Sequence, residues 1–240
     1  MRILITNDDG IGASGLLPLA RWARKLGQVV VAAPKVEQSG KSHGIELHKP
    51  FEVKQVDFGE GITAYAVDST PADCVRYAVL GRKEAFDLAI SGINRGFNIG
   101  SDIMYSGTVS AVCEAANLGM KAIAVSTDPA YYDRAVEQMD AVYSYIRDNR
   151  LLEKHGLYNI NIPEGARGIC ITRQGGPYFS DDFIPVGNDL VSPKGKCVYV
   201  DGNSDELDTD VVLHGSISVM PLTIDRTDMS MFRQLREWNP

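Results

Sequence analysis

The sequence predicts an α/β fold with a mainly parallel sheet and helices on both faces. Three observations support this prediction. Short apolar runs such as Ile3–Ile5 alternate with segments of helical spacing throughout the first half of the chain. The 240 residues are enough to bury a full core, and 44% hydrophobic with 23% charged residues is typical of globular proteins. The chain contains no run of about 18 apolar residues, so no membrane-spanning segment is expected.

The expected elements of the first half alternate between strand and helix. Leu16–Leu26 has helical spacing, with Ser14 as its N-cap and Gly27 at its end. Thr70 followed by Pro71 is typical of a helix start. After a long loop, Ser91–Tyr105, Ser106 or Thr108 is expected to cap a helix that runs to about Leu118. Besides Ile3–Ile5, strands are expected at Val29–Ala33, Ile45–Val56, Thr63–Val67, Phe86–Ile90 and Ala122–Val125.

The pattern changes after Asp128–Pro129, which predicts a core of residues 1–129 and a C-terminal part of residues 130–240 that packs on it. Residues 174–203 are rich in turn formers and predict an extended hairpin, with strand pieces around Phe183–Val186 and Cys197–Val200. Further elements are expected as a helix at Ala135–Ile146, strands at Tyr158–Ile162, Gly168–Thr172 and Ile217–Ile224, and a terminal helix at Asp228–Trp238.

Charge and cysteine content narrow the class of protein. Lys and Arg number 24 against 31 Asp and Glu, and a formal net charge of −7 disfavours binding to a nucleic-acid duplex. The 4 cysteines form no C-x-x-C pair, so buried reduced thiols are expected rather than a zinc site. Asp8 and Asp9 interrupt the N-terminal apolar run, which argues against a signal peptide and predicts a cytoplasmic protein.

Two glycine-containing motifs are misleading. Gly10–Gly15 fits G-x-G-x-x-G after a strand, but the preceding Asp8 and Asp9 would repel a pyrophosphate, and the second strand leads into Lys35 instead of an acid. Ser39–Ser42 resembles the end of a P-loop, but Lys35 stands where that loop needs its first glycine. Both segments are therefore interpreted as loops, and a dinucleotide cofactor is disfavoured.

Oxygen donors follow the ends of three predicted strands. Asp8 and Asp9 follow the first strand, Ser39 follows the second, and Ser91, Asn94 and Asn98 follow the strand that ends at Ile90. Ligands of a parallel sheet bind at the carboxyl ends of its strands, where these side chains would meet. Without His or Cys, such donors suit a hard cation such as Mg²⁺, Mn²⁺ or Ca²⁺. An Asx-turn or a helix-capping acid pair is the structural alternative.

The segment Tyr105–Val109 indicates an anion site. Ser106, Gly107 and Thr108 combine small hydroxyl side chains with a glycine at a helix start, where backbone N–H groups and the helix dipole attract anions. Helix capping alone would also explain these residues. Beside a hard-cation site, however, such a segment is typical of a metal-dependent phosphohydrolase.

These segments together resemble the survival protein SurE family of metal-dependent nucleotidases. The resemblance covers nearly all of residues 1–126 and is weak over 130–215. It is carried by Ile3–Gly10, Ser39-Gly40, Ser69–Val75, Ser91–Gly100, Tyr105–Val109, Ile123–Ser126 and Ile217–Leu222.

The resemblance implies a Rossmann-like core and a C-terminal part that forms a homodimer or homotetramer. It implies hydrolysis of nucleoside 5′- and 3′-monophosphates, and in some members of short polyphosphate, with one divalent cation per subunit. By position, the cation ligands would be Asp8, Asp9, Ser39 and Asn94, and the phosphate would be held by Asn98, Ser106, Gly107 and Thr108. The chain departs from the family pattern at Gly12, Ser14, Lys41 and Phe97, which affects the expected substrate preference rather than the reaction class.

The expected mechanism is in-line attack on phosphorus by a metal-activated water, with Asp8 and Asp9 as the catalytic carboxylates. Asp9 and His43 are both candidates for the general acid or base, and the sequence does not choose between them. Asp8 as a covalent nucleophile is an alternative, although phosphoaspartyl enzymes use Asp-x-Asp spacing. A non-catalytic nucleotide-binding module with the same phosphate site is a further alternative.

Overall fold

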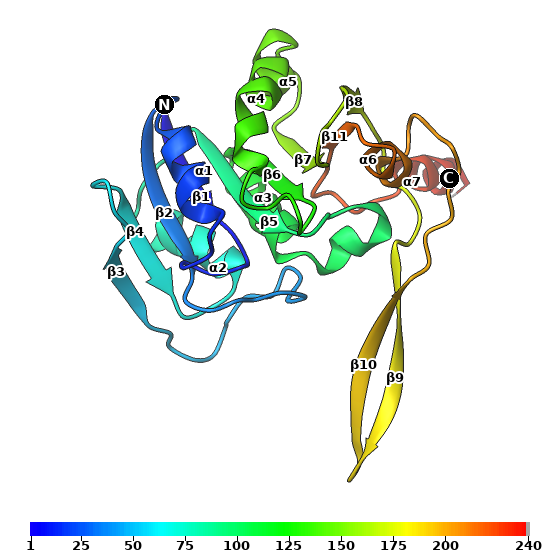
Figure 1. Cartoon of the computed structure of the whole chain (residues 1–240), viewed down its shortest axis with the longest axis horizontal. Helices are drawn as coiled ribbons and strands as arrows, with labels where there is room; N and C mark the ends of the chain where they lie inside the picture. Colours follow the sequence, from blue (N-terminus) through cyan, green and yellow to red (C-terminus); the bar gives the residue numbers. More distant parts are fainter. Residues whose placement is uncertain (239–240) are drawn as a thin grey trace.

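The computed structural model describes residues 1–238 and is built on a nine-stranded sheet in the order β3-β4-β2-β1-β5-β6-β7-β11-β8 (Figure 1). Parallel pairing predominates, and the antiparallel pairs within this sheet are β3 with β4 and β11 with β7. The strands are β1 Arg2–Thr6, β2 Gln28–Pro34, β3 Val53–Asp57, β4 Thr63–Val67, β5 Leu88–Arg95, β6 Lys121–Thr127, β7 Leu157–Ile162, β8 Ile169–Ile171 and β11 Ile217–Pro221. The predicted mainly parallel sheet is confirmed.

Helices cover both faces of this sheet because its strands are apolar on both sides. Ile3 and Ile5 of β1 pack into a cluster with α1 (Leu16–Ala23) and α4 (Met139–Asp148). Leu4 points to the opposite face and packs with α2 (Pro71–Arg76) and α3 (Gly107–Asn117). Successive side chains of a strand alternate between faces, so a continuous apolar strand requires cover on both. The prediction of helices on both faces is confirmed.

Two of the predicted helix starts are confirmed and one is wrong. The Thr70 hydroxyl accepts a hydrogen bond from the Asp73 amide (3.1 Å), and the Ser106 hydroxyl accepts one from the Val109 amide (3.1 Å). Ser14, by contrast, donates its hydroxyl to Asp133 (2.9 Å), and α1 begins after Gly15 without a side-chain cap. The contact with Asp133 comes from a segment 119 residues away, which local sequence does not reveal.

Several element bounds differ from the prediction. Within the predicted strand Ile45–Val56, only residues from Val53 onward form a strand, β3. The earlier part lies against α2, because the Glu46 amide donates a hydrogen bond to the Asp73 carboxylate. Strand β5 extends to Arg95, into the predicted loop, and the rest of that loop holds the 3-10 helix η2 (Gly100–Tyr105). Residues Tyr77–Gly81 continue α2 as the π-helix η1, and the 3-10 turn η3 (Ala135–Gln138) precedes α4.

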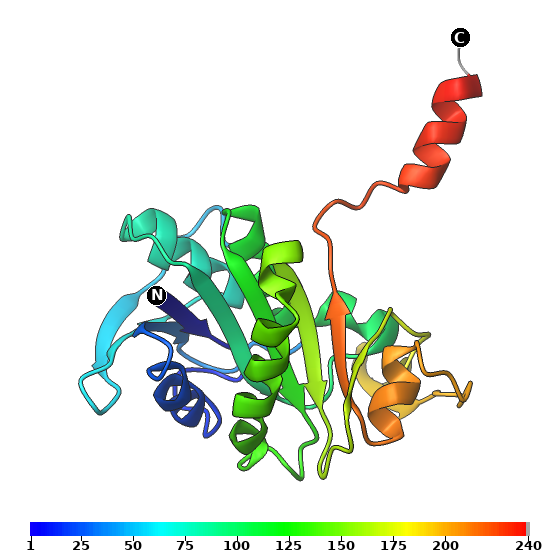
Figure 2. The ribbon, with the colours of Figure 1, turned by 90° about the horizontal axis from the view of Figure 1, so that it is seen from above.

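The predicted hairpin is present and extends far from the body of the molecule (Figure 1). It consists of β9 (Phe179–Gly187) and β10 (Leu190–Cys197), so the second strand lies earlier than the predicted Cys197–Val200. The short helices α5 (Leu151–Lys154) and α6 (Asp208–Leu213) were not predicted from the sequence. The terminal helix α7 (Met229–Trp238) is confirmed and projects away from the sheet (Figure 2).

The C-terminal part shares the sheet of the first half. β6 pairs in parallel with β7, so the sheet passes the predicted boundary between residues 129 and 130, and that division stays a prediction. Cys74 is buried, Cys113 and Cys170 are half-buried, and Cys197 on the hairpin is exposed, which corrects the expectation that all four are buried. Among residues 1–238, no helix is long and apolar enough to span a membrane.

Candidate metal and phosphate site

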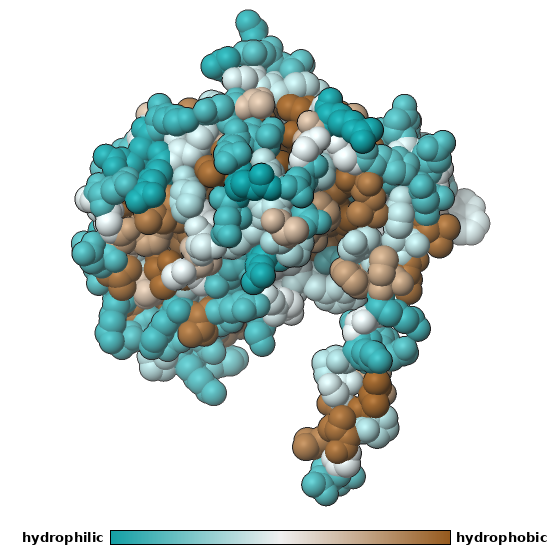
Figure 3. All heavy atoms as spheres, in the orientation of Figure 1, coloured by the Kyte–Doolittle hydropathy of each residue, from teal (hydrophilic) through white to brown (hydrophobic). Residues whose placement is uncertain are grey.

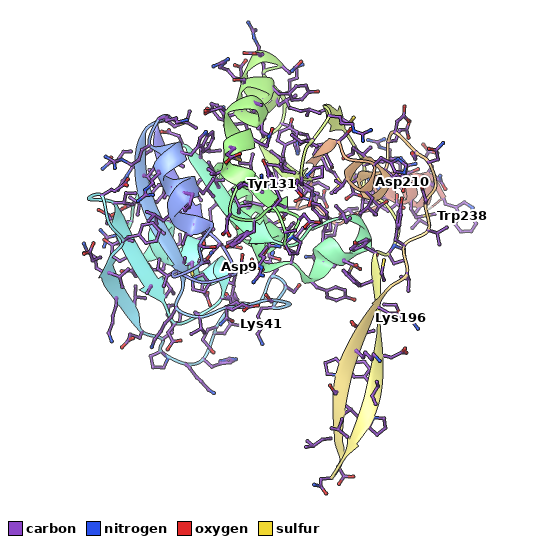
Figure 4. The ribbon with its side chains drawn as sticks, in the orientation of Figure 1. Asp9, Lys41, Tyr131, Lys196, Asp210 and Trp238 are labelled. Carbon is purple, nitrogen blue, oxygen red and sulfur yellow. The ribbon has the colours of Figure 1, made fainter. Side chains whose placement is uncertain are left out.

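The loops that follow β1, β2 and β5 meet at one edge of the sheet. The Gln38 amide of the loop after β2 donates to the Asp8 carbonyl oxygen (2.7 Å). The Arg95 amide at the end of β5 donates to Asp9 Oδ2 (3.1 Å). Ser39 and Asn94 are the chain neighbours of these two donors, so the structure brings all four predicted cation ligands to the same edge. Figure 4 marks Asp9 near the centre of the view, with Lys41 on the loop below it.

A tight turn lets the two carboxylates follow the strand directly. Asn7 Nδ2 donates to the Gly10 carbonyl oxygen (2.9 Å), and the Gly10 amide donates back to Asn7 Oδ1 (3.2 Å). Gly10 has φ +100°, and a Cβ at this position would lie 3.3 Å from the Glu37 amide nitrogen. Glycine is therefore required both for the backbone conformation and for the close approach of the loop after β2.

The N-terminus of α3 faces the Asp8 carboxylate. The Thr108 hydroxyl donates to Asp8 Oδ1, and the backbone of Gly107 and Thr108 also hydrogen-bonds this side chain. A Cβ on Gly107 would lie 2.8 Å from the Asp8 Cβ, so only glycine admits this contact. The positive end of the helix dipole thus acts on Asp8, which is 4% exposed. The structure therefore places the predicted phosphate segment directly against Asp8, one of the predicted cation ligands.

Burial makes the carboxyl groups of Asp8 and Asp9 harder to ionise than they are in water. Burial raises the pKa of Asp8, and the hydrogen bonds from Thr108 offset part of this effect. Burial, followed by the negative charge of Asp8, raises the pKa of Asp9 to about 6, and the Arg95 amide opposes that rise. A group of positive charge at this point would relieve the desolvation and the repulsion together.

The remaining donors fit a hard cation. Asn94 Nδ2 donates to the Gly96 carbonyl oxygen (2.8 Å), which leaves the amide oxygen of Asn94 as an acceptor. The exposed Ser39 donates its hydroxyl to Glu37 (2.6 Å) and keeps its lone pairs. Within residues 1–238, the buried hydroxyls of Thr6 at the end of β1 and of its β5 neighbour Ser91 have no hydrogen-bond partner. Carboxylate, amide and hydroxyl oxygens are the ligands that Mg²⁺, Mn²⁺ and Ca²⁺ prefer.

Asn98 is held by several polar partners at the same edge. Its amide hydrogen is donated to Asn161 Oδ1 (2.8 Å), and its side-chain Nδ2 donates to the Ser126 hydroxyl (2.8 Å). Asn159 and Asn161 both donate to its carbonyl oxygen, each at 2.8 Å. These contacts fix Asn98 at the ends of β6 and β7, so its predicted role toward phosphate stays a prediction.

Tyr132 is a site residue that sequence reasoning missed. Its hydroxyl lies 3.5 Å from Asp9 Oδ2. Its ring packs so closely on Gly15 that a Cβ at this glycine would lie 2.8 Å from the ring carbon Cε2. Tyr132 therefore covers the N-terminus of α1, the place where a dinucleotide would put its pyrophosphate, which agrees with the interpretation of Gly10–Gly15 as a loop. The contact with Asp9 spans 123 residues, and no local motif indicated it.

The other sequence-derived candidates lie around the site. His43 contacts Glu114 of α3 (2.9 Å), and Glu114 lies about 9 Å along the helix axis from Thr108. Lys41 is exposed on the loop after β2. Of the remaining positions that depart from the family pattern, Gly12 and Ser14 are exposed in the turn before α1, and Phe97 is half-buried after β5.

The fold and this site define an α/β protein in which two adjacent carboxylates and a helix N-terminus meet at the carboxyl edge of a mainly parallel sheet. The family model described as "Survival protein SurE" matches residues 3–181. The chain therefore belongs to the SurE family.

Similar proteins extend over the full chain. A "5′-nucleotidase SurE" of Thermoanaerobacter sp. (strain X514) is 37% identical over 256 residues, covering 100% of this chain and 98% of that protein. A protein of the same name from Natranaerobius thermophilus is 39% identical over 259 residues, covering 99% and 98%. The crystal structure of the SurE protein from Aquifex aeolicus matches with a TM-score of 0.79 at 29% identity and covers 100% of both chains.

The raised pKa of Asp9 predicts the effect of removing its charge in metal-free protein. We expect Asp9→Asn to be more stable than the parent at pH 7 by on the order of 1 kcal/mol, because an ionised Asp9 is desolvated and repelled by Asp8. Since the folded-state pKa is about 6 and the ordinary pKa of an aspartate is 3.8, the free energy of unfolding of the parent should fall as pH rises between these values.

Urea unfolding in EDTA between pH 4 and pH 7 measures this effect, and the variant should show a flatter pH dependence. Asp133→Asn, at an exposed residue of the Ser14 contact, serves as the control. A variant that is less stable than the parent at pH 7 would show that Asp9 instead holds the turn together.

Proposed function

We propose that the chain is a divalent-metal-dependent phosphohydrolase that releases phosphate from nucleoside monophosphates. The observation that carries this proposal is the contact of the α3 N-terminus with the carboxylate pair, which joins an anion-binding helix end to an oxygen-donor cation site. The names of the relatives support the nucleotide substrate, since they are called 5′-nucleotidases and match nearly the whole of this chain.

Each residue of the site has a separate part in the proposal. Asp8 and Asp9 would hold Mg²⁺ or Mn²⁺ through charged oxygens, and Ser39 and Asn94 would complete the set with neutral oxygens; Ca²⁺ suits the same donors. The bound cation would supply positive charge for the phosphoryl oxygens and make water a better nucleophile near neutral pH. Asp9 is also a candidate general base in the same reaction, in addition to its role as a cation ligand.

The helix end would act on the phosphoryl group itself. Amide groups of Gly107 and Thr108 already stabilise negative charge on Asp8, and a phosphoryl oxygen placed beside Asp8 would share the same field. Ser106, which caps the helix, holds these amides in place. Asn98 would bind the phosphate from the side of β6 and β7.

The finer substrate range is also a proposal. We expect both 5′- and 3′-monophosphates to be hydrolysed, because the interactions above concern the phosphate and the cation alone, and short polyphosphate presents the same phosphoryl oxygens. A panel of these substrates with Mg²⁺, Mn²⁺ and Ca²⁺ tests the range. Binding of nucleotide without any phosphate release would instead identify a non-catalytic nucleotide-binding module.

The protruding segments support assembly into a homodimer or homotetramer. The hairpin exposes a run of large apolar side chains, visible as brown spheres in Figure 3, and α7 has no buried residue. Such surfaces in one chain are typical of interfaces. The hairpin members are Phe179, Phe183, Ile184, Val186, Leu190 and Val191, and those of α7 are Met229, Met231, Phe232, Leu235 and Trp238.

Asp8→Asn tests the cation site. We expect Mn²⁺ or Mg²⁺ to raise the melting temperature of the parent, because an ion that binds only the folded state adds about 2.7 kcal/mol at one hundred times its dissociation constant. The variant should show a much smaller shift and almost no hydrolysis, and without metal it should be at least as stable as the parent. Monovalent salt of equal ionic strength is the control. A variant that keeps both the metal shift and the activity would contradict the assignment.

Thr108→Val tests the anion site. The variant keeps the side-chain shape but removes the hydroxyl that donates a hydrogen bond to Asp8. We therefore expect substrate and phosphate to bind more weakly by about 1–3 kcal/mol. Steady-state kinetics and inhibition by inorganic phosphate measure this loss. Ser110→Ala, at a buried serine half a turn further along α3, is the matched control. Unchanged kinetics and phosphate inhibition would place the anion site elsewhere.

Deleting residues 180–198 tests the role of the hairpin in assembly. The Val198 amide donates to the Tyr178 carbonyl oxygen (2.9 Å), so the chain ends at the base of the hairpin already lie together. Light scattering should show at least a dimer for the intact chain and weaker association for the deletion. A monomeric intact chain at tens of micromolar, about the level at which obligate dimers stay assembled, would contradict the proposal.

A further inference from the structure

A buried ionic network lies beside the site and connects α2, α3 and the loop after β2. Glu114 of α3 is only 5% exposed. One of its carboxylate oxygens accepts from Arg76 Nη1 of α2 (2.9 Å), and the other contacts His43 Nε2 of the loop (2.9 Å). Arg76 also reaches Asp73, with 4.0 Å between Nε and Oδ1. A buried carboxylate is stable only when such partners satisfy it, so this network holds its members in place.

The same network fixes the far end of the loop formed by residues 35–46, here called the β2 loop. Next to His43, Ser42 donates its amide to the Tyr105 carbonyl oxygen (3.1 Å) and its hydroxyl to the Met104 carbonyl oxygen (2.7 Å). The Glu46 amide donates to the Asp73 carboxylate (2.8 Å), which also accepts the Ser69 hydroxyl (2.6 Å). Backbone and side-chain groups that are far away in the sequence therefore bind residues 42–46 of this loop.

The near end of the β2 loop is held at the site by a hydrogen bond from the Gln38 amide to the Asp8 carbonyl oxygen. Between these attachments lie Ser39, Gly40 and Lys41, all of them exposed, and Gly40 has φ +70°. The position of Ser39 relative to the carboxylate pair therefore depends on both attachments, because its own segment has little packing to hold it.

The geometry points to His43 as a positioning residue: through Glu114 it holds the β2 loop against α3, the helix whose first turn binds Asp8, and so sets the position of Ser39. This inference rests on the proposed function for the ligand role of Ser39. It differs from a catalytic role for His43, because the histidine binds a carboxylate about 9 Å along α3 from Thr108. The hydrogen bonds from His43 and from Arg76 lower the pKa of Glu114, while its burial opposes them.

Two measurements on His43→Ala test the inference. The first is the rate of tryptic cleavage after Lys41, which requires the loop to open. This rate should rise several-fold in the variant, because the free energy needed to open the loop locally becomes smaller. The second is Mn²⁺ binding to substrate-free protein, followed by electron paramagnetic resonance. We expect the dissociation constant for Mn²⁺ to rise about tenfold, as for loss of a residue that orients a ligand. The kcat at saturating Mn²⁺ and substrate should stay close to that of the parent.

Two further variants serve as controls. His43→Gln can still donate to Glu114 and should restore most of the parental protection and affinity. His48→Ala removes an exposed histidine of the following segment and should change neither measurement.

Each other outcome overturns the inference in a distinct way. Unchanged cleavage at Lys41 would show that His43 does not hold the loop, and faster cleavage with unchanged Mn²⁺ affinity would show that the loop does not position a ligand. A loss in kcat of about 10²–10⁴ with unchanged Mn²⁺ affinity would make His43 a general acid or base. If the parent itself binds no Mn²⁺, the proposed function fails, while cleavage at Lys41 still decides whether His43 holds the loop.

Discussion

The confinement of Asp8 and Asp9 at the end of β1 is the constraint on which the rest of the site depends. Two adjacent carboxylates that are removed from water repel each other, and burial raises the pKa of both. The surrounding structure compensates with directed hydrogen bonds from Thr108 and Arg95. Such partial compensation leaves a demand for positive charge, which a bound cation would meet.

Two glycines make this confinement sterically possible. Gly10 turns the chain after the carboxylates and lets the β2 loop approach, and Gly107 lets the first turn of α3 reach Asp8. A side chain at Gly107 would push the end of α3 away from the Asp8 carboxylate. In the proposed reaction the cation and the helix end would act on the same phosphoryl group, and the two glycines would keep them close enough to do so.

Attachment of the loops is the second level of organisation around the carboxylates. β1 and β5 are rigid parts of the sheet, but Ser39 lies on an exposed loop that depends on His43, Ser42 and Gln38 for its position. The candidate site thus combines oxygen donors on the strands of the sheet with one donor, Ser39, on an exposed loop. Lys41 lies on the exposed part of this loop, next to the residues that attach it to α3.

The sequence by itself determined the α/β class, most strand positions, the helix starts at Thr70 and Ser106, and the polar residues that follow the strands of the sheet. These features depend on local patterns: apolar runs, capping residues and the placement of polar residues after strands. The tertiary structure decided the rest. Ser14 does not cap a helix because Asp133 binds it, Ile45–Val56 is mostly loop because Asp73 binds Glu46, and Tyr132 reaches Asp9 across the fold. Such contacts join segments that are distant along the chain, and their energies depend on burial and packing, which no local pattern of residues encodes.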